Sequence, residues 1–162
     1  MRYALGLLVA ATLQTGGADS SSRVWIEGGS NVAAKWSCRA ERFDARMDSG
    51  HVSVRLGARD LKCGNHRMDR DLYAALKDSA IAARFDSKSQ GTLSVAGVER
   101  HVVADVTVEQ TPDGSYRARG SVPLLMTDFG IKPPVGLFGL IRSKNELVVR
   151  FDLVIRPDGS EW

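Results

Sequence analysis

The sequence has no run of like charge, no apolar run long enough to cross a membrane and only two cysteines. Its 22 basic and 19 acidic residues are interleaved along the chain, and the formal net charge is only +3. A dedicated nucleic-acid surface needs clustered cations that neutralise several phosphates, so we expect no nucleic-acid partner. The N-terminal apolar run, residues 3–13, is shorter than the ~20 residues that a membrane helix requires. We therefore expect no integral membrane span.

Common catalytic motifs are also missing. The sequence contains no G-x-S-x-G elbow, no H-E-x-x-H and no glycine-rich phosphate loop. His51, His66 and His101 lie in distant segments, and His51 and His101 fall on the outward side of the predicted strands. Asp69 and Asp71 lie in the first turn of a predicted helix, where acidic residues suit the helix dipole. We predict a protein that is not an enzyme and holds no metal.

The N-terminus has the organisation of an export signal. A charged start, Met1-Arg2, is followed by the apolar run and then by small and polar residues, with a plausible cleavage site after Gly16-Gly17-Ala18. The alternatives are an N-terminus without structure or a buried first strand. We predict a signal peptide over residues 1–18, one domain over residues 19–162, and secretion to a bacterial periplasm.

Two cysteines fit this compartment. Exported chains with an even cysteine count usually pair them, so Cys38 and Cys63 predict a disulfide. Such a link would stabilise the fold by about 3–3.5 kcal/mol in the loop-entropy model. Two free thiols, or a metal or redox site that uses Cys63 with His66, remain alternatives, although structural zinc requires four ligands.

Alternation of apolar and polar residues with a period of two dominates the rest of the chain. It predicts about eight antiparallel strands with one face buried, and the length of these strands favours a closed barrel over a two-sheet sandwich. The inward positions of the alternation are Val32, Ala34, Trp36 and Cys38; Phe43, Ala45 and Met47; Val52, Val54, Leu56 and Ala58; Ile81, Ala83 and Phe85; Leu93 and Val95; Val102, Ala104, Val106 and Val108; Tyr116, Ala118, Gly120 and Val122; and Leu147, Val149, Phe151, Leu153 and Ile155.

Two segments depart from the alternation. Met68, Leu72, Ala75 and Leu76 recur at helical spacing and predict one amphipathic helix, from about Asp69 to Asp78, that caps an end of the sheet structure. Residues 130–142 are apolar but contain two prolines and three glycines. They cannot form an interior strand, so we predict a hydrophobic loop near an opening.

Many of the inward residues are small, which leaves two interpretations open. An eight-stranded barrel is at the size where side chains either fill it or leave room for one ligand. Small residues favour an apolar cavity, whereas alternation of small and large residues also fits the taper of a filled barrel. The candidate ligand-binding residues are Ala34, Trp36, Phe43, Ala45, Val54, Phe85, Ala104, Val106, Ala118, Asp128, Phe129, Phe138 and Phe151, with Asp128 as a polar group at the mouth.

Three stretches in order resemble one family. GTLSVAGVERHV (residues 91–102) is similar to the G-x-L-t-l-x-G-v-t-k-x-v hairpin of the YceI-like family, MDRDL (68–72) to its R-D-x-x-L helix start, and TDFGI (127–131) to its D-F-G-hydrophobic segment. The resemblance covers about residues 23–156. It implies a lipocalin-like periplasmic barrel associated with polyisoprenoid binding. The cysteine pair and Lys132-Pro133-Pro134 indicate a divergent member.

The sequence therefore predicts an all-β, antiparallel, lipocalin-like barrel with one helix. Its predicted function is to bind or carry a long-chain apolar lipid, such as an isoprenoid quinone or a polyprenyl lipid, inside the barrel. No cofactor is expected apart from that lipid, and a homodimer is left open. One alternative is a structural or stress-response module with a filled barrel and a partner-binding outer face. A redox protein that uses Cys38, Cys63 and His66 is another.

Overall fold

The computed structural model describes residues 16–17, 21–32, 35–48, 50–86, 88–136 and 141–156. These residues form two six-stranded antiparallel sheets and one helix. The first sheet has the strand order β1-β4-β5-β7-β8-β9. Its strands are β1 (Gly16–Gly17), β4 (Asp44–Asp48), β5 (His51–Gly57), β7 (Ala80–Phe85), β8 (Gln90–Val95) and β9 (Val98–Val103).

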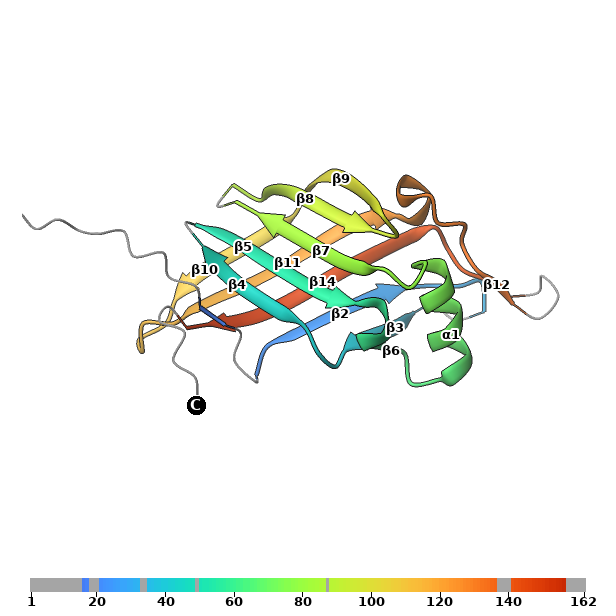
Figure 1. Cartoon of the computed structure of the whole chain (residues 1–162), viewed down its shortest axis with the longest axis horizontal. Coiled ribbons are helices and arrows are strands. Elements are labelled where there is room, and N and C mark those ends of the chain that lie inside the picture. The colour runs from blue at the N-terminus through green and yellow to red at the C-terminus, as the bar shows by residue number, and fades with distance from the viewer. Residues whose placement is uncertain are drawn as a thin grey trace, which may run out of the picture.

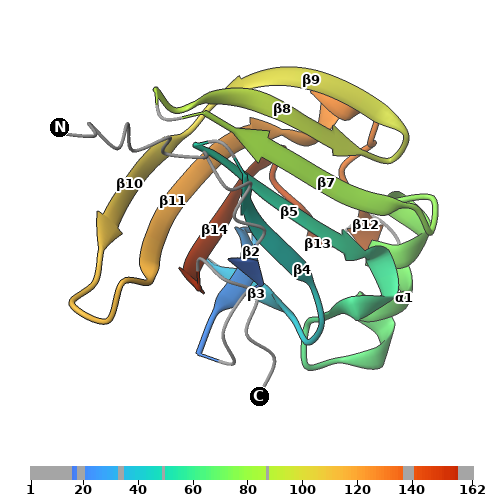
Figure 2. The ribbon, with the colours of Figure 1, turned by 60° about the vertical axis from the view of Figure 1, so that its left-hand side comes forward.

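The second sheet faces the first across a shared apolar interior (Figure 2). Its order is β10-β11-β14-β2-β3-β6. The strands are β10 (Asp105–Gln110), β11 (Tyr116–Leu125), β14 (Glu146–Ile155), β2 (Arg23–Gly28), β3 (Trp36–Ala40) and β6 (Leu61–Lys62). A separate two-stranded ladder joins β12 (Val135–Gly136) to β13 (Ile141–Arg142).

The two sheets are joined where β9 continues into β10. Ala104 is the only residue between these strands, and its N–H donates to the carbonyl of Ser89 at 2.8 Å. A second connection is the short 3₁₀ turn Ala58–Asp60, which links β5 to β6. Among the described residues no ladder pairs β1 or β4 with the second sheet. The predicted lipocalin-like, antiparallel fold is confirmed, as a barrel that hydrogen bonds do not close completely.

The helix α1 (His66–Ala75) covers one end of the two sheets (Figure 1). It begins three residues before the predicted start because Asn65 caps it, accepting hydrogen bonds from the N–H groups of Arg67 and Met68. It also ends before the predicted Asp78, since Lys77 and Asp78 have positive φ angles of 52° and 51°. The sequence signal for the earlier start was the asparagine itself.

The predicted alternation holds for most strands. Two of the predicted inward residues are exposed, and one strand was not predicted. Val32 precedes β3 and its exposed fraction is 65%, and Val108 is 44% exposed on β10, which is an edge strand with no neighbour on one side. The strand β2 was not predicted, although Val24 and Ile26 alternate in the same way and are buried. Ala34 lies outside the described residues.

One half of the interior is packed solid. Its inward side chains come from β4, β7, β8, β11 and β14, and Leu153 and Ile155 have no exposed surface. The rings of Phe85 and Phe151 stack at a centroid distance of 6.2 Å. The predicted filling by large side chains therefore applies to the half of the barrel away from α1.

Candidate functional site

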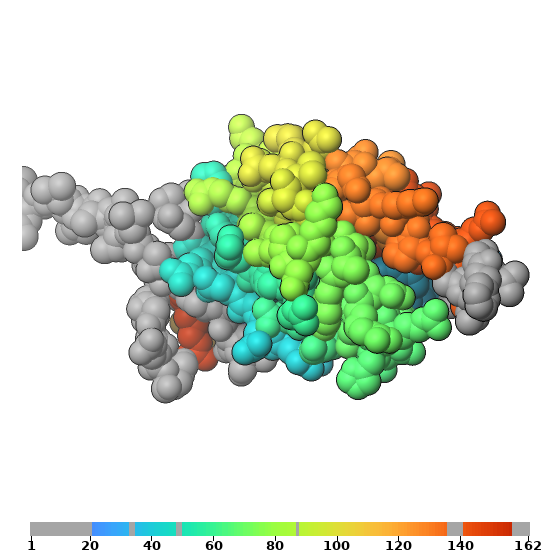
Figure 3. Space-filling view, turned by 45° about the vertical axis from the view of Figure 1, so that its right-hand side comes forward, coloured from blue at the N-terminus to red at the C-terminus, as the bar shows by residue number. Residues whose placement is uncertain are grey.

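The other half of the interior contains a cavity of about 420 Å³. It lies between the two sheets and under α1, and residues of both sheets and of the helix form its walls. Figure 3 shows this end of the molecule, with the green surface of α1 below the orange segment that follows β11. The lining residues are Ile26, Ser30, Val32, Trp36, Cys38, Cys63, Asn65, Arg67, Met68, Asp71, Leu72, Ala75, Leu76, Ile81, Val95, Leu124, Met126, Ile131, Pro134, Val135, Ile141, Ser143, Leu147 and Val149.

The helix contributes one wall of the cavity. The apolar side chains that recur at helical spacing, Met68, Leu72, Ala75 and Leu76, all line it. The apolar face of the helix, predicted from its spacing in the sequence, therefore faces a cavity. The polar side of the helix faces outward, and Arg70 and Ala74 are exposed.

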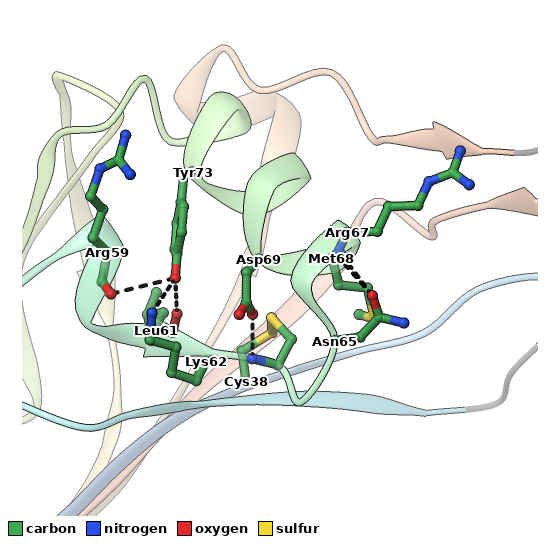
Figure 4. The surroundings of a disulfide bond; sticks show 10 residues. Cys38, Arg59, Leu61, Lys62, Asn65, Arg67, Met68, Asp69 and Tyr73 are labelled. Atoms are coloured by element: carbon green, nitrogen blue, oxygen red, sulfur yellow. Dashed lines mark hydrogen bonds between the residues drawn. A yellow bond between two sulfur atoms is a disulfide. The ribbon is translucent and has the colours of Figure 1, made fainter.

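A disulfide holds the start of the helix against the second sheet. Cys38 of β3 is bonded to Cys63, which immediately follows β6, as predicted (Figure 4). The buried carboxylate of Asp69 points at this link and accepts a hydrogen bond from the Cys63 N–H at 2.7 Å. These contacts fix the segment between β6 and α1, and both cysteines line the cavity.

Tyr73 anchors the last turn of the helix. Its hydroxyl donates to the carbonyl of Leu61 at 2.8 Å and accepts from Lys62 Nζ at 2.9 Å (Figure 4). The hydrogen bond that Lys62 donates to the Tyr73 hydroxyl raises the pKa of Lys62 above its ordinary value. Arg59 and Lys62 also lie over the ring, each 5.5 Å from its centroid. The helix is therefore held near its start by the disulfide and Asp69, and near its end by Tyr73.

The wall opposite the helix comes from the segment after β11. The 3₁₀ turn Met126–Phe129 ends at Gly130, whose φ of 68° reverses the chain. Asn145 holds this turn, since its side chain accepts from the Thr127 N–H at 3.1 Å and donates to the Thr127 hydroxyl at 3.0 Å. Ile131, like Met126, lines the cavity. Pro134, Val135 and Ile141 of the predicted hydrophobic loop also line the cavity, and the described part of this loop contains the short ladder of β12 and β13.

Charged side chains are few in the cavity lining. The charged side chains among the lining residues are Arg67 and Asp71, and both are exposed. In Figure 4 the Arg67 side chain extends away from the disulfide. Trp36 presents its ring to the cavity while its indole N–H donates to the carbonyl of Gly29 at 3.2 Å. The cavity wall is therefore apolar where it would enclose an apolar ligand, and the charged side chains lie where that ligand would meet water.

The predicted ligand-binding residues separate into groups. Trp36 lines the cavity. Asp128 is exposed beside the turn, and it is not among the cavity-lining residues. Phe129 is buried in the same turn, and Ala104 lies at the bend between β9 and β10. Of the remaining candidates, Phe43, Ala45, Val54, Phe85, Val106, Ala118 and Phe151 belong to the packed core or contact it, and Ala34 and Phe138 lie outside the described residues.

Most of the lining residues were not among the ligand-binding candidates predicted from the sequence. Ile26, Leu147 and Val149 lie on β2 and β14, and Met68 and Leu72 lie on the helix. Their signals were present, because both the helical apolar face and the inward positions of the last strand were identified. What the sequence could not supply was which inward side chains of distant strands meet each other.

A redox or metal site that uses Cys63 with His66 would need a free thiol, which the disulfide removes in this structure. Cys63 is bonded to Cys38, and His66, at the first position of α1, is exposed. In the described part of the chain, no group of three or more histidine, cysteine or carboxylate side chains is placed to hold a metal ion. No helix within the described ranges has the length and apolarity to span a membrane.

The outer face of the second sheet carries ion pairs. Arg117 donates two hydrogen bonds to Asp152, at 2.9 and 2.8 Å, and these lower the pKa of the Asp152 carboxyl. Arg150 donates a hydrogen bond to Glu27 at 2.8 Å, and this bond is the largest cause of the lowered Glu27 pKa. Arg119 lies 3.8 Å from Asp152. Arg117 and Arg119 are thus oriented toward a carboxylate of the chain itself.

Comparisons with known proteins agree with this fold. The profile of the YceI-like domain matches residues 19–155. A polyisoprenoid-binding domain from Saccharophagus degradans has a TM-score of 0.71 at 10% identity, covering 90% of this chain and 99% of that one. BcnA from Burkholderia cenocepacia has a TM-score of 0.66 at 14% identity, covering 85% and 98%. Comparison with curated proteins gives no match.

Proposed function

The chain belongs to the YceI-like family, and from the apolar cavity of its fold we propose that it binds and carries a long-chain apolar lipid without converting it. An isoprenoid quinone or a polyprenyl lipid is the class we favour. The observation that carries the proposal is the cavity under α1, whose walls are apolar and whose charged groups are confined to the rim. The Saccharophagus relative, described as a polyisoprenoid-binding domain, supports the same class.

The energetics of such a site follow from burial. Each methylene group removed from water contributes about 0.8 kcal/mol, before the cost of ordering the chain and the protein. Apolar walls distinguish neighbouring chain lengths by only ~1–3 kcal/mol, so the walls alone give weak selectivity among similar lipids. Carriage requires binding and release. The helix α1 belongs to neither sheet, and it is held through Asp69, through Tyr73 and, by way of the segment before it, through the disulfide.

A cavity-blocking variant tests the proposal. Ala75 lines the cavity, whereas its neighbour Ala74 is exposed on the other side of the same helix. We expect Ala75→Trp to lose binding of a fluorescent polyprenyl analogue and Ala74→Trp to retain it. Mass spectrometry of lipid extracted from natively purified protein should find an apolar chain in the wild type and less of it in Ala75→Trp. An empty extract, together with no uptake of the analogue by the wild type, would refute carriage.

We also propose that the protein acts after export to a periplasm, with residues 1–18 removed. The leader-like N-terminus and a disulfide, which persists in oxidising compartments, support this location. The test is the mass of the protein recovered from a periplasmic fraction. A mature N-terminus at residue 19 is expected, and full-length protein retained in the cytosolic fraction would contradict the proposal.

A further inference from the structure

Two aromatic rings close the deep end of the cavity. Ile81 of β7 and Val149 of β14 line the cavity, and farther along the same inward faces lie Phe85 and Phe151. Phe85 is 2% exposed and Phe151 is 4% exposed, and their rings stack with an interplanar angle of 23°. Neither ring lines the cavity. The hollow therefore ends where one strand from each sheet contributes a phenylalanine that meets the other.

Glycines on the neighbouring strands make room for both rings. Gly120 of β11 is the register partner of Phe151, and Gly91 of β8 is the partner of Phe85. A Cβ atom added at Gly120 would overlap the Phe151 ring, and one added at Gly91 would overlap the Phe85 ring and the backbone of Arg84. Each ring thus lies against a glycine, and a side chain at either glycine would displace the ring.

Behind the rings the interior is filled. Leu153 is the next inward residue of β14 after Phe151 and has no exposed surface, and Ile155 follows it in the same state. Ala118, the register partner of Leu153 on β11, is equally buried. A chain that entered under α1 would therefore meet the ring pair and could not continue past it without displacing a packed core.

We propose that the Phe85–Phe151 pair is the specificity-determining floor of the site and sets how much of an apolar chain the protein encloses. This inference rests on the proposed function, since it assumes that a chain occupies the cavity. The apolar walls then determine how tightly a chain is bound, and the Phe85–Phe151 pair determines which chain length fits. Carbons of a longer chain remain in the mouth, next to Arg67 and Asp71.

A length series of polyprenyl alcohols tests the floor. Each alcohol is one isoprene unit longer than the last, and its affinity is measured by displacement of a fluorescent polyprenyl analogue. For the wild type, affinity should rise with length, by up to about fourfold for each buried methylene, and then level off at the length that reaches the floor. In Phe151→Ala this break should move to a longer alcohol by about one isoprene unit, with at least a ~10-fold gain for that alcohol over the wild type.

Leu153→Ala is the matched control. It removes a buried side chain from the same strand behind the floor, so it should lose stability and keep the wild-type break. Phe151→Leu is a milder second variant, in which a smaller shift in the same direction is expected if Phe151→Ala fails to fold by circular dichroism. An unchanged break in both Phe151 variants, or an equal shift in Leu153→Ala, would overturn this inference alone. If the wild type binds no alcohol of the series, the proposed function fails and the floor assignment fails with it.

Discussion

The disulfide that anchors α1 gives the most quantitative prediction about the fold. Cys38 and Cys63 are 25 residues apart in sequence, and closing a loop of that length lowers the entropy of the unfolded chain by an amount worth about 3.5 kcal/mol at 25 °C. The double variant Cys38→Ala/Cys63→Ala should therefore lose about 3.5 kcal/mol of unfolding free energy. With a urea m-value near ~2 kcal/mol/M, the midpoint should fall by about 1.5–2 M.

The assay is urea denaturation followed by circular dichroism, on the wild type and the double variant, each with and without dithiothreitol. Reduced wild type should match the variant, and the variant should not respond to dithiothreitol. Hydrogen exchange should rise most in the segment from Cys63 through α1, because β11 and β14 keep their ladder. The reasoning is refuted if the variant lies within about 1 kcal/mol of the oxidised wild type, or if β14 opens as much as α1.

Three further predictions follow from named contacts. Asp152→Asn should lower the unfolding free energy at pH 7 by about 1 kcal/mol, because its bonds from Arg117 are partly screened by solvent. Folding lowers the pKa of Asp152, so the stability that its carboxylate contributes is present above the ordinary value of 3.8 and is lost as pH falls through the lowered folded pKa. Urea titrations at pH 6 to 2 should therefore show a shallower fall of the unfolding free energy with acid in the variant than in the wild type. An identical fall in both would contradict the assignment. Tyr73→Phe should cost about 1 kcal/mol and speed hydrogen exchange in α1, and unchanged exchange would show that the hydroxyl does not hold the helix. Gly120→Ala should destabilise by about 1–3 kcal/mol by forcing the Phe151 ring to move, and Phe151→Leu should cost less in that background than in the wild type, whereas additive losses in a double-mutant cycle would refute the overlap.

Local alternation was enough to predict most of the strands, and helical spacing was enough to predict the apolar face of the helix. A period of two reports which side of a strand is buried, and this is a property of each segment alone. The helix boundaries moved because capping by Asn65 and the left-handed residues Lys77 and Asp78 decide them, and periodicity does not. The strand β2 was missed although the residues around Trp25 alternate, so that omission was avoidable.

The location of the hollow could not be predicted in the same way. Small inward residues suggested a cavity, yet Ala45 and Ala118 are buried in the half that is packed solid. Small residues there are neighbours of large ones, as Gly120 is of Phe151. Whether a small side chain faces a ring or a void depends on which strands meet across the interior. That is set by register and by the crossing of two sheets, which a single sequence does not encode locally.

The most direct measurement of the central claim is where a bound chain touches the protein. A polyprenyl probe with a photoreactive group at the end of its chain would be crosslinked in the wild type, and the labelled residues would be identified by mass spectrometry. The account predicts labels on cavity-lining residues such as Leu72 of α1 and Val149 of β14, and their loss in Ala75→Trp. Labels confined to the outer faces of the sheets, or labels that persist when the cavity is blocked, would contradict it.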